Sequence, residues 1–146
     1  MNRYLEYKNK KQEEFNKFPM KFAFSDKQFE EAMKELGLTP EDTDKVVSIG
    51  CNGFIKKEDS QAFVEMINRN KEEFERLVVE DKTGEGFICD MFDYELRNHE
   101  YGYVYSQAIE ETLDCLGFTE EDVAKDPRLS KGLEIAKGKV LRSYGE

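Results

Sequence analysis

The stretch D-K-T-G-E-G-F-I-C-D-M-F-D-Y-E-L, Asp81–Leu96, decides the local fold because it contains a turn followed by an amphipathic segment. Two glycines, Gly84 and Gly86, mark the turn. From Ile88 onward, apolar residues recur at steps of three and four, which is the period of a helix with one buried face. The stretch therefore predicts a turn and a core helix that runs to about Asn98.

The turn resembles a calcium-binding loop, and a similar loop lies upstream at Ser48–Asp59. An EF-hand loop needs oxygen ligands at positions 1, 3 and 5, a glycine at 6 and a bidentate glutamate at 12. The loop Asp81–Phe92 ends on Phe92 and the upstream loop ends on Asp59, so neither has that glutamate. Both loops are predicted not to bind a metal, and their Gly-Phe-Ile steps are interpreted as related turns that enter core elements.

The predicted helix places Glu95 and His99 along its apolar stripe, one turn apart. His99 is the only histidine of the chain. A carboxylate and an imidazole at the edge of a core must find partners or change their ionisation. The first interpretation is a buried Glu95–His99 hydrogen bond that ties the end of the helix to the tyrosine-rich connection after it.

Two other interpretations remain open for the same region. Tyrosines and acids together can form a binding surface, because tyrosine supplies both contact area and a hydrogen-bonding group. One histidine among carboxylates is also a ligand set for a metal or an acid–base pair, although no H-E-x-x-H motif is present. The candidate residues, functional or structural, are Asp90, Asp93, Glu95, Asn98, His99, Glu100, Tyr101 and Tyr103.

The remaining patterns predict a predominantly helical α+β protein with two or three short strands. Residues 1–17 are expected to form a loosely docked helix. Capping residues, prolines and helical periods predict further helices over 25–36, from Thr39–Pro40, from Asp59 or Ser60, over 106–116, and after Thr119 and Asp126. Residues 46–49 and 54–55 are expected to form a hairpin. No linker divides the chain, so residues 1–146 are predicted to form a single compact domain.

The composition is that of a soluble globular protein with a formal net charge of -10. Such a charge repels phosphate backbones, so direct nucleic-acid binding is not expected. No apolar run suits a signal peptide or a membrane span, and the three cysteines lack C-x-x-C spacing, which favours a cytoplasmic protein with reduced thiols. The G-x-S-x-G, Walker and G-x-G-x-x-G motifs are missing, so no cofactor is expected and an enzyme is disfavoured.

Several motifs carry a resemblance to a family of small uncharacterised proteins encoded on conjugative elements and plasmids of gut Gram-positive bacteria. These motifs are F-I-C-D-M-F-D-Y-E-L-R-N-H-E-Y-G-Y, E-T-L-D-C-L-G-F-T and D-P-R-L-S-K-G-L. The similarity covers about residues 20–140, but the family has a glycine-rich first turn where this chain has Cys51 and Asn52. No activity is established for the family. The resemblance therefore implies only a setting, an accessory gene of mobile DNA that is expressed in the bacterial cytoplasm.

Three functional hypotheses follow. The first is a non-enzymatic interaction protein that binds an unidentified protein partner through Asp90–Tyr105, where the tyrosines cluster. The second is an anti-restriction or anti-CRISPR inhibitor in which the negative charge imitates a nucleic acid. The third is a metal-dependent enzyme that uses Glu95, His99 and nearby carboxylates.

Overall fold

The computed structural model describes residues 2–145, and its contacts divide the chain into two compact units. The helical unit combines Met1–Lys10 with Glu73–Glu146, and the sheet unit spans Lys11–Glu72. The chain is 69% helical, which confirms the predominantly helical α+β class. The single domain over residues 1–146 stays a prediction. Among the described residues, no helix has both the length and the apolar character needed to cross a membrane.

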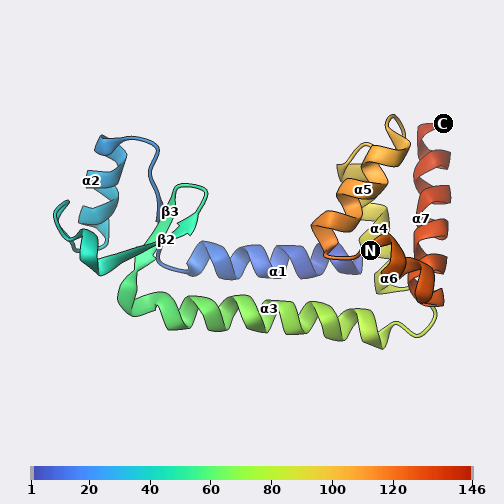
Figure 1. Ribbon diagram of the computed structural model, residues 1–146, viewed down its shortest axis with the longest axis horizontal. Coiled ribbons are helices and arrows are strands. Elements are labelled where there is room, and N and C mark those ends of the chain that lie inside the picture. Colours follow the sequence, from blue (N-terminus) through green and yellow to red (C-terminus); the bar gives the residue numbers. More distant parts are fainter. Residues whose placement is uncertain (1, 146) are drawn as a thin grey trace. The chain divides into compact units, whose positions relative to one another are not determined.

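The elements follow each other along the chain in nearly the predicted order (Figure 1). They are α1 (Arg3–Lys17), β1 (Met20–Phe22), α2 (Asp26–Glu35), η1 (Thr43–Lys45), β2 (Val46–Gly50), β3 (Gly53–Lys56), η2 (Lys57–Asp59), α3 (Ser60–Glu80), α4 (Phe87–Asn98), α5 (Tyr105–Leu116), α6 (Glu120–Lys125) and α7 (Pro127–Tyr144). Helices α1 and α3 each begin in one unit and end in the other.

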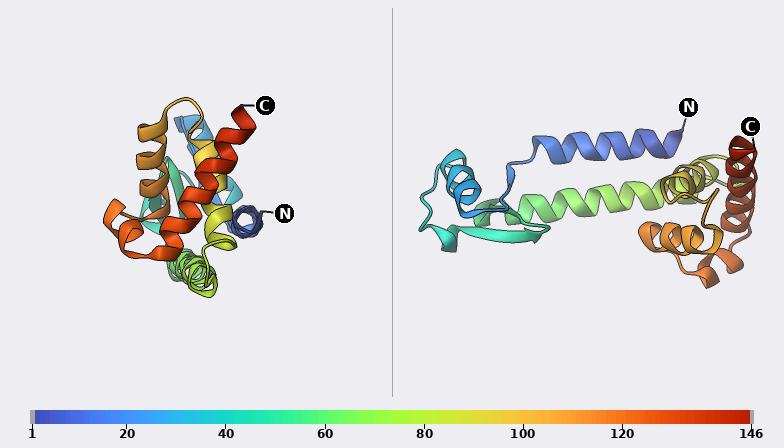
Figure 2. Two further views of the ribbon diagram at one scale, coloured as in Figure 1. Left: turned by 90° about the vertical axis from the view of Figure 1, so that its right-hand side faces the viewer. Right: turned by 90° about the horizontal axis from the view of Figure 1, so that it is seen from above.

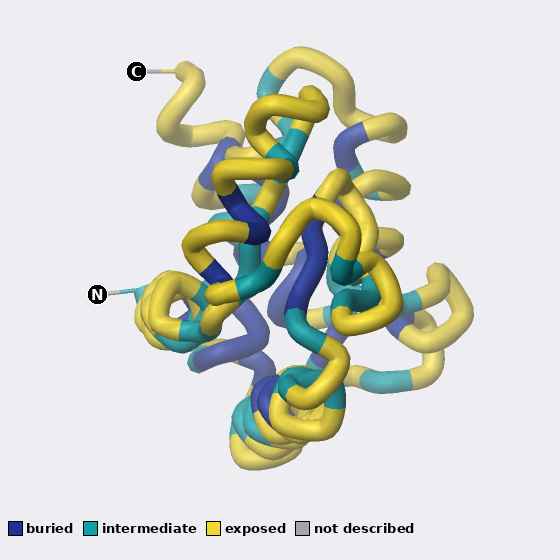
Figure 3. The backbone as a smooth tube through the Cα atoms, turned by 90° about the vertical axis from the view of Figure 1, so that its left-hand side faces the viewer, coloured by how far each residue is buried: buried dark blue, intermediate teal, exposed yellow. Residues whose placement is uncertain are grey.

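The sheet unit is built on an antiparallel sheet with the strand order β1-β3-β2. The predicted hairpin is confirmed: Cys51 and Asn52 adopt φ values of 51° and 64°, as the two central residues of a tight hairpin turn require. Phe54 and Ile55 of the central strand are buried, and Met33 of α2 packs in the same cluster as Phe54. Figure 3 colours this buried strand dark blue, in contrast to the largely exposed turns.

The helix predicted from Thr39–Pro40 is wrong. The chain instead forms a turn and a short 3₁₀ helix, Thr43–Lys45. The carboxylate of Asp42 accepts hydrogen bonds from the backbone N–H of Thr39 over 2.8 Å and from its hydroxyl over 3.1 Å. These bonds close the turn and lower the pKa of Asp42. Strand β2 then begins at Val46, which leaves no length for an α-helix.

Helix α4 is the centre of the helical unit. It packs most extensively on α7 and also contacts α5. Figures 1 and 2 show α4 between these two helices. The predicted amphipathic helix is thus confirmed, and its described buried residues are Phe87, Ile88, Cys89, Met91, Phe92, Glu95 and Leu96. Complete burial of a large side chain such as Phe92 contributes roughly 2–3 kcal/mol.

Candidate functional site

The side chain of Glu95 is fully buried within the helical unit and contacts residues of two neighbouring helices. Cys115 on α5 donates its thiol hydrogen to Oε2 over 2.8 Å. Lys8 on α1 places Nζ 3.5 Å from Oε1. Because Oε1 has no hydrogen-bond partner among the described atoms, the Lys8 contact is an ion pair without hydrogen-bond geometry. A buried carboxylate requires such compensation, so Glu95 joins α1, α4 and α5.

Aromatic rings hold Lys8 beside this carboxylate. Its Nζ lies 5.6 Å from the ring centroid of Tyr4 and 5.1 Å from that of Tyr94, within the range of cation–π attraction. Burial, and then the negative charge of Glu95, raise the pKa of Tyr4 far above its ordinary value. The phenol of Tyr4 therefore stays neutral at physiological pH, and it anchors the first turns of α1 in the core.

The predicted hydrogen bond between Glu95 and His99 is present, but the imidazole bonds to the backbone carbonyl of Glu95 and not to its carboxylate. The imidazole Nδ1 lies 2.8 Å from the backbone carbonyl oxygen of Glu95 and 3.4 Å from Oγ1 of Thr112. Because a carbonyl oxygen only accepts, Nδ1 carries the hydrogen. The same carbonyl also accepts from the backbone N–H of His99. The half-buried ring therefore stabilises the last turn of α4 through its backbone and contacts Thr112 of α5.

The other predicted residues do not converge on one point. The carboxylate of Asp90 accepts from the backbone N–H of Arg3 over 3.0 Å, which ties α4 to the start of α1. Asp93 forms an ion pair with Arg97 over 3.1 Å. Tyr101 is buried, whereas the exposed members of the predicted set are Asn98, Glu100 and Tyr103. Within residues 2–145, no three His, Cys, Asp or Glu side chains form a group that could hold a metal ion.

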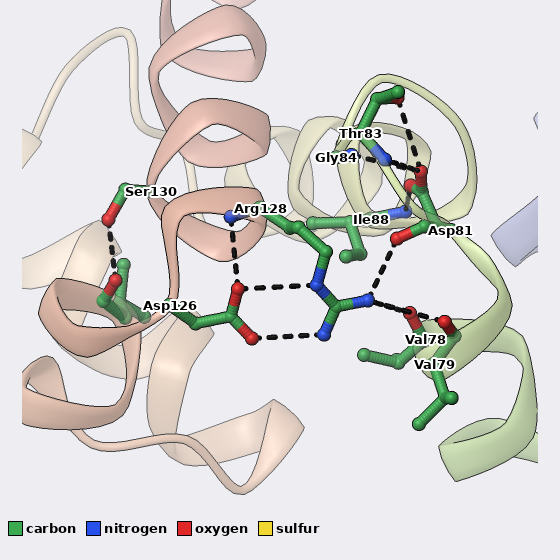
Figure 4. Close-up of polar contacts among 10 residues, drawn as sticks. Val78, Val79, Asp81, Thr83, Gly84, Ile88, Asp126, Arg128 and Ser130 are labelled. Atoms are coloured by element: carbon green, nitrogen blue, oxygen red, sulfur yellow. Dashed lines mark hydrogen bonds and ion pairs between the residues drawn. The ribbon is translucent and has the colours of Figure 1, made fainter.

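The loop Asp81–Phe92 is a helix start organised by Asp81 (Figure 4). Its two carboxylate oxygens accept from four backbone N–H groups, those of Thr83, Gly84, Gly86 and Ile88. Burial favours a higher pKa for Asp81, but these four donors together outweigh it and lower the pKa. The carboxylate is thus directed at the backbone that begins α4.

The two Gly-Phe-Ile steps are not related turns, so that interpretation is wrong. Residues 53–55 lie in strand β3, where they pair with β1 and β2. Residues 86–88 instead end the Asp81 loop and enter α4. The same three letters take different structures because one step follows a hairpin turn and the other follows a loop closed by a carboxylate.

Arg128, which the sequence analysis did not single out, joins this loop to α7. Its guanidinium donates to the carbonyl oxygens of Val78 and Asp81, each over 2.8 Å, and forms an ion pair with Asp126 over 2.9 Å (Figure 4). The accepting carbonyls lie at the end of α3, where a helix has no intrahelical donors left. Gly84 approaches the Arg128 backbone so closely that a Cβ atom would lie 2.2 Å from the Arg128 carbonyl oxygen.

Exposed apolar side chains gather where the α4–α5 connection meets the end of α7. This tyrosine patch comprises Tyr103, Val104, Tyr105, Leu141 and Tyr144, which are 41% to 72% exposed. The rings of Tyr103 and Tyr144 meet edge to face, with centroids 5.1 Å apart. Gly102 permits this approach, because a Cβ atom there would lie 2.2 Å from the Tyr144 ring. The patch therefore combines two segments that are distant in the sequence.

Residues 3–139 match a family model that is described as a family of unknown function (DUF7659). The match includes α4, the connection after it and most of α7. No curated protein and no solved structure matches the chain.

Proposed function

This chain belongs to the DUF7659 family of unknown function, and we propose that it is a non-enzymatic protein-interaction module. The tyrosine patch carries the proposal. Tyr103 is 72% exposed although Tyr101, two residues earlier, is buried. Tyrosine is enriched at protein interfaces because its ring supplies contact area and its hydroxyl a hydrogen bond. Apolar side chains that gather on a surface are typical of a binding site.

The contacts around Glu95 support the same proposal because they give the buried polar groups structural partners. The Glu95 carboxylate contacts Cys115 and Lys8, and the imidazole of His99 contacts the α4 backbone. These contacts hold α1, α4 and α5 together. The segment that carries Tyr103 therefore begins directly after a helix, α4, that is firmly packed. A rigid base lowers the entropy that is lost when a surface binds its partner.

We propose that the module acts in the bacterial cytoplasm as an accessory protein of a mobile genetic element. This setting is suggested by the E-L-R-N-H-E-Y-G-Y motif, residues 95–103, which resembles that of small proteins encoded on conjugative elements and plasmids. Within the described residues, Cys51, Cys89 and Cys115 form no disulfide, which agrees with a reducing compartment.

The double substitution Tyr103→Ala/Tyr144→Ala is expected to reduce capture of the partner by at least about tenfold, because central interface tyrosines typically contribute more than 1 kcal/mol each. Tyr103 is 72% exposed and Tyr144 is 42% exposed, and neither belongs to the buried core, so the fold is expected to persist. The measurement is affinity capture from a bacterial lysate, with bound proteins quantified by mass spectrometry. Tyr101→Ala is unsuitable because that ring is buried.

The matched control for this experiment is Phe24→Ala in the sheet unit. Phe24 is an aromatic residue with 73% exposure, and it lies outside the tyrosine patch. It is expected to leave capture unchanged. Equal capture by the wild-type chain and the double tyrosine variant would exclude the patch as the interface.

A second candidate function, inhibition of a nuclease by nucleic-acid mimicry, is favoured by one observation. Residues 105–125 carry six exposed acids and only one cation, Lys125. We expect that Glu110→Lys/Glu111→Lys/Asp114→Lys would abolish such inhibition and that salt would weaken it in the wild-type chain. Competition between the protein and DNA for a restriction nuclease measures both effects, and inhibition that ignores ionic strength would contradict mimicry.

A further inference from the structure

The sheet unit has a cavity of about 420 Å³ where strand β2 begins and strand β3 ends. This volume lies in the range of pockets that bind small molecules. Leu38, which follows α2 and packs against the core of this unit, supplies an apolar part of the wall. The charged residues that line the cavity come from η1 and from the junction of β3 with η2, and they are Asp44, Lys45, Lys56, Lys57 and Glu58.

The pairing of β2 with β3 brings the lysines of this cavity together. The two strands are antiparallel, and Val46 lies opposite Lys56. The residue before Val46 is Lys45 and the residue after Lys56 is Lys57, so the same register brings these two lysines side by side. The short helices that carry them, η1 and η2, are in contact. Like charges on opposite residues of paired strands are destabilising, and an anion between these lysines would offset that repulsion.

The ammonium groups of these lysines have few acceptors in the part of the chain that the structure describes. Lys57 forms no ion pair or side-chain hydrogen bond there. The side chain of Lys56 is only 29% exposed, and its ion pair with the 75% exposed Glu58 is 3.6 Å long, too long for a hydrogen bond. Lys45 lies 3.5 Å from Asp42. Each ammonium has three hydrogens to donate, so the cavity offers donors that a bound anion can use.

We propose that this cavity binds a small phosphorylated molecule, whose phosphate oxygens accept hydrogen bonds from Lys45, Lys56 and Lys57. Lysine binds phosphate as a point charge. A phosphate group has three oxygens and nearly two negative charges at pH 7, so it can contact several ammonium groups at once. A carboxylate ligand has a single charge to share among them and is a poorer match.

The other lining residues limit the size of the ligand. Asp44 and Glu58 reduce the net charge of the lining to +1, since three lysines face two acids. These acids, in a chain of net charge -10, repel an extended phosphate backbone, so a small ligand fits better than a nucleic acid. Leu38 can contact the carbon skeleton of such a ligand. The site lies in the sheet unit, and the proposal is therefore independent of the tyrosine patch.

Titration of the full chain with inorganic pyrophosphate, at constant ionic strength and followed by the amide signals in NMR spectra, tests the proposal. Shifts are expected at residues 44–45 and 56–58 but not at 103–105, with a Kd of about 1 mM or lower. Lys57→Glu is expected to weaken binding by at least about tenfold, because it removes a donor and adds a charge that repels phosphate. Glu58→Gln is expected to strengthen binding about fivefold, because it removes such a charge.

Lys71→Glu is the matched control for Lys57→Glu. Both lysines are exposed residues of the sheet unit, and within residues 2–145 neither forms an ion pair. Lys71 lies on α3 and does not line the cavity. The two variants therefore have the same net charge, and the control is expected to change the Kd by less than about twofold. The amide spectrum of each variant without pyrophosphate shows whether its fold is intact.

The absence of shifts in the wild-type chain up to about 10 mM pyrophosphate would overturn the proposal. Equal weakening by Lys57→Glu and Lys71→Glu would also overturn it, because binding would then follow the net charge of the chain and not the cavity. Shifts confined to residues outside the lining would have the same consequence.

Discussion

Substitution of Gly84 by alanine is expected to lower the free energy of unfolding of the helical unit by more than about 4 kcal/mol. Gly84 has a φ of +88°, and a Cβ atom there would lie 2.2 Å from the carbonyl oxygen and 2.9 Å from the carbonyl carbon of Arg128. Both obstacles are backbone atoms at the start of α7, so no side-chain rotation relieves the overlap. Urea unfolding followed by circular dichroism measures the loss.

Gly117→Ala is the matched control for this substitution. Gly117 has a similar φ of +82°, but nothing lies within 4 Å of the position of its Cβ atom. Alanine at this position is therefore expected to cost only the strain of a left-handed conformation, about 1–2 kcal/mol. The difference between the two variants isolates the close approach of the Asp81 loop to α7. Equal losses for Gly84→Ala and Gly117→Ala would contradict the packing of Gly84 against Arg128.

Substitution of Asp81 by alanine is expected to lower the free energy of unfolding by about 3 kcal/mol at pH 7, because four backbone N–H groups lose a charged acceptor. Asp81→Asn is expected to cost about half as much, since its amide oxygen replaces Oδ1 while its amide nitrogen faces the N–H groups of Gly86 and Ile88. Urea unfolding at pH 7 measures both losses. Asp114→Asn, at an exposed position on α5, controls for the loss of one negative charge.

The loss of unfolding free energy caused by Asp81→Ala is also expected to depend on pH. The pKa of Asp81 is lowered in the folded protein, so its carboxylate stabilises the fold above the ordinary pKa of about 3.9 and loses this contribution as the pH falls through the folded-state pKa. The stability difference between the wild-type chain and Asp81→Ala is expected to be constant from about pH 7 to 5 and to shrink toward pH 2. Other carboxylates with lowered pKa values, such as Asp126, are present in both proteins and cancel. A difference that grows as the pH falls would contradict this role for Asp81.

The candidate site was predictable in its position but not in its partners. The helical period correctly placed Glu95 on the buried face of α4, because that signal depends only on neighbouring residues. The same reasoning paired its carboxylate with His99, the nearest complementary group in the sequence. The structure instead pairs it with Lys8 and Cys115. The four-residue spacing of Tyr4 and Lys8 indicates a shared helix face, but no local signal shows which helix that face meets.

The tyrosine patch was likewise predictable in its position along the chain but not in the contacts that form it. The three tyrosines within residues 101–105 predict a tyrosine-rich connection, yet Tyr101 is buried and Tyr103 is exposed. The contact of Tyr103 with Tyr144 depends on the end of α7, which lies about forty residues further along the chain. The alternating tyrosines in the sequence therefore predicted the segment, whereas tertiary packing determined which of their side chains are exposed.

The amino-acid sequence alone determined where most helices and strands begin and end. Capping residues, glycines and the helical spacing of apolar residues are signals that involve only residues within one or two turns of each other. Thr39–Pro40 is the exception, and there Asp42 and the start of β2 override the local signal. Only the tertiary structure decided the partners of Arg128 and Glu95. These two groups contact atoms that come within reach only after separate elements have packed together, and no local pattern encodes that distance. Asp81 differs, because its carboxylate accepts hydrogen bonds from backbone N–H groups of its own loop.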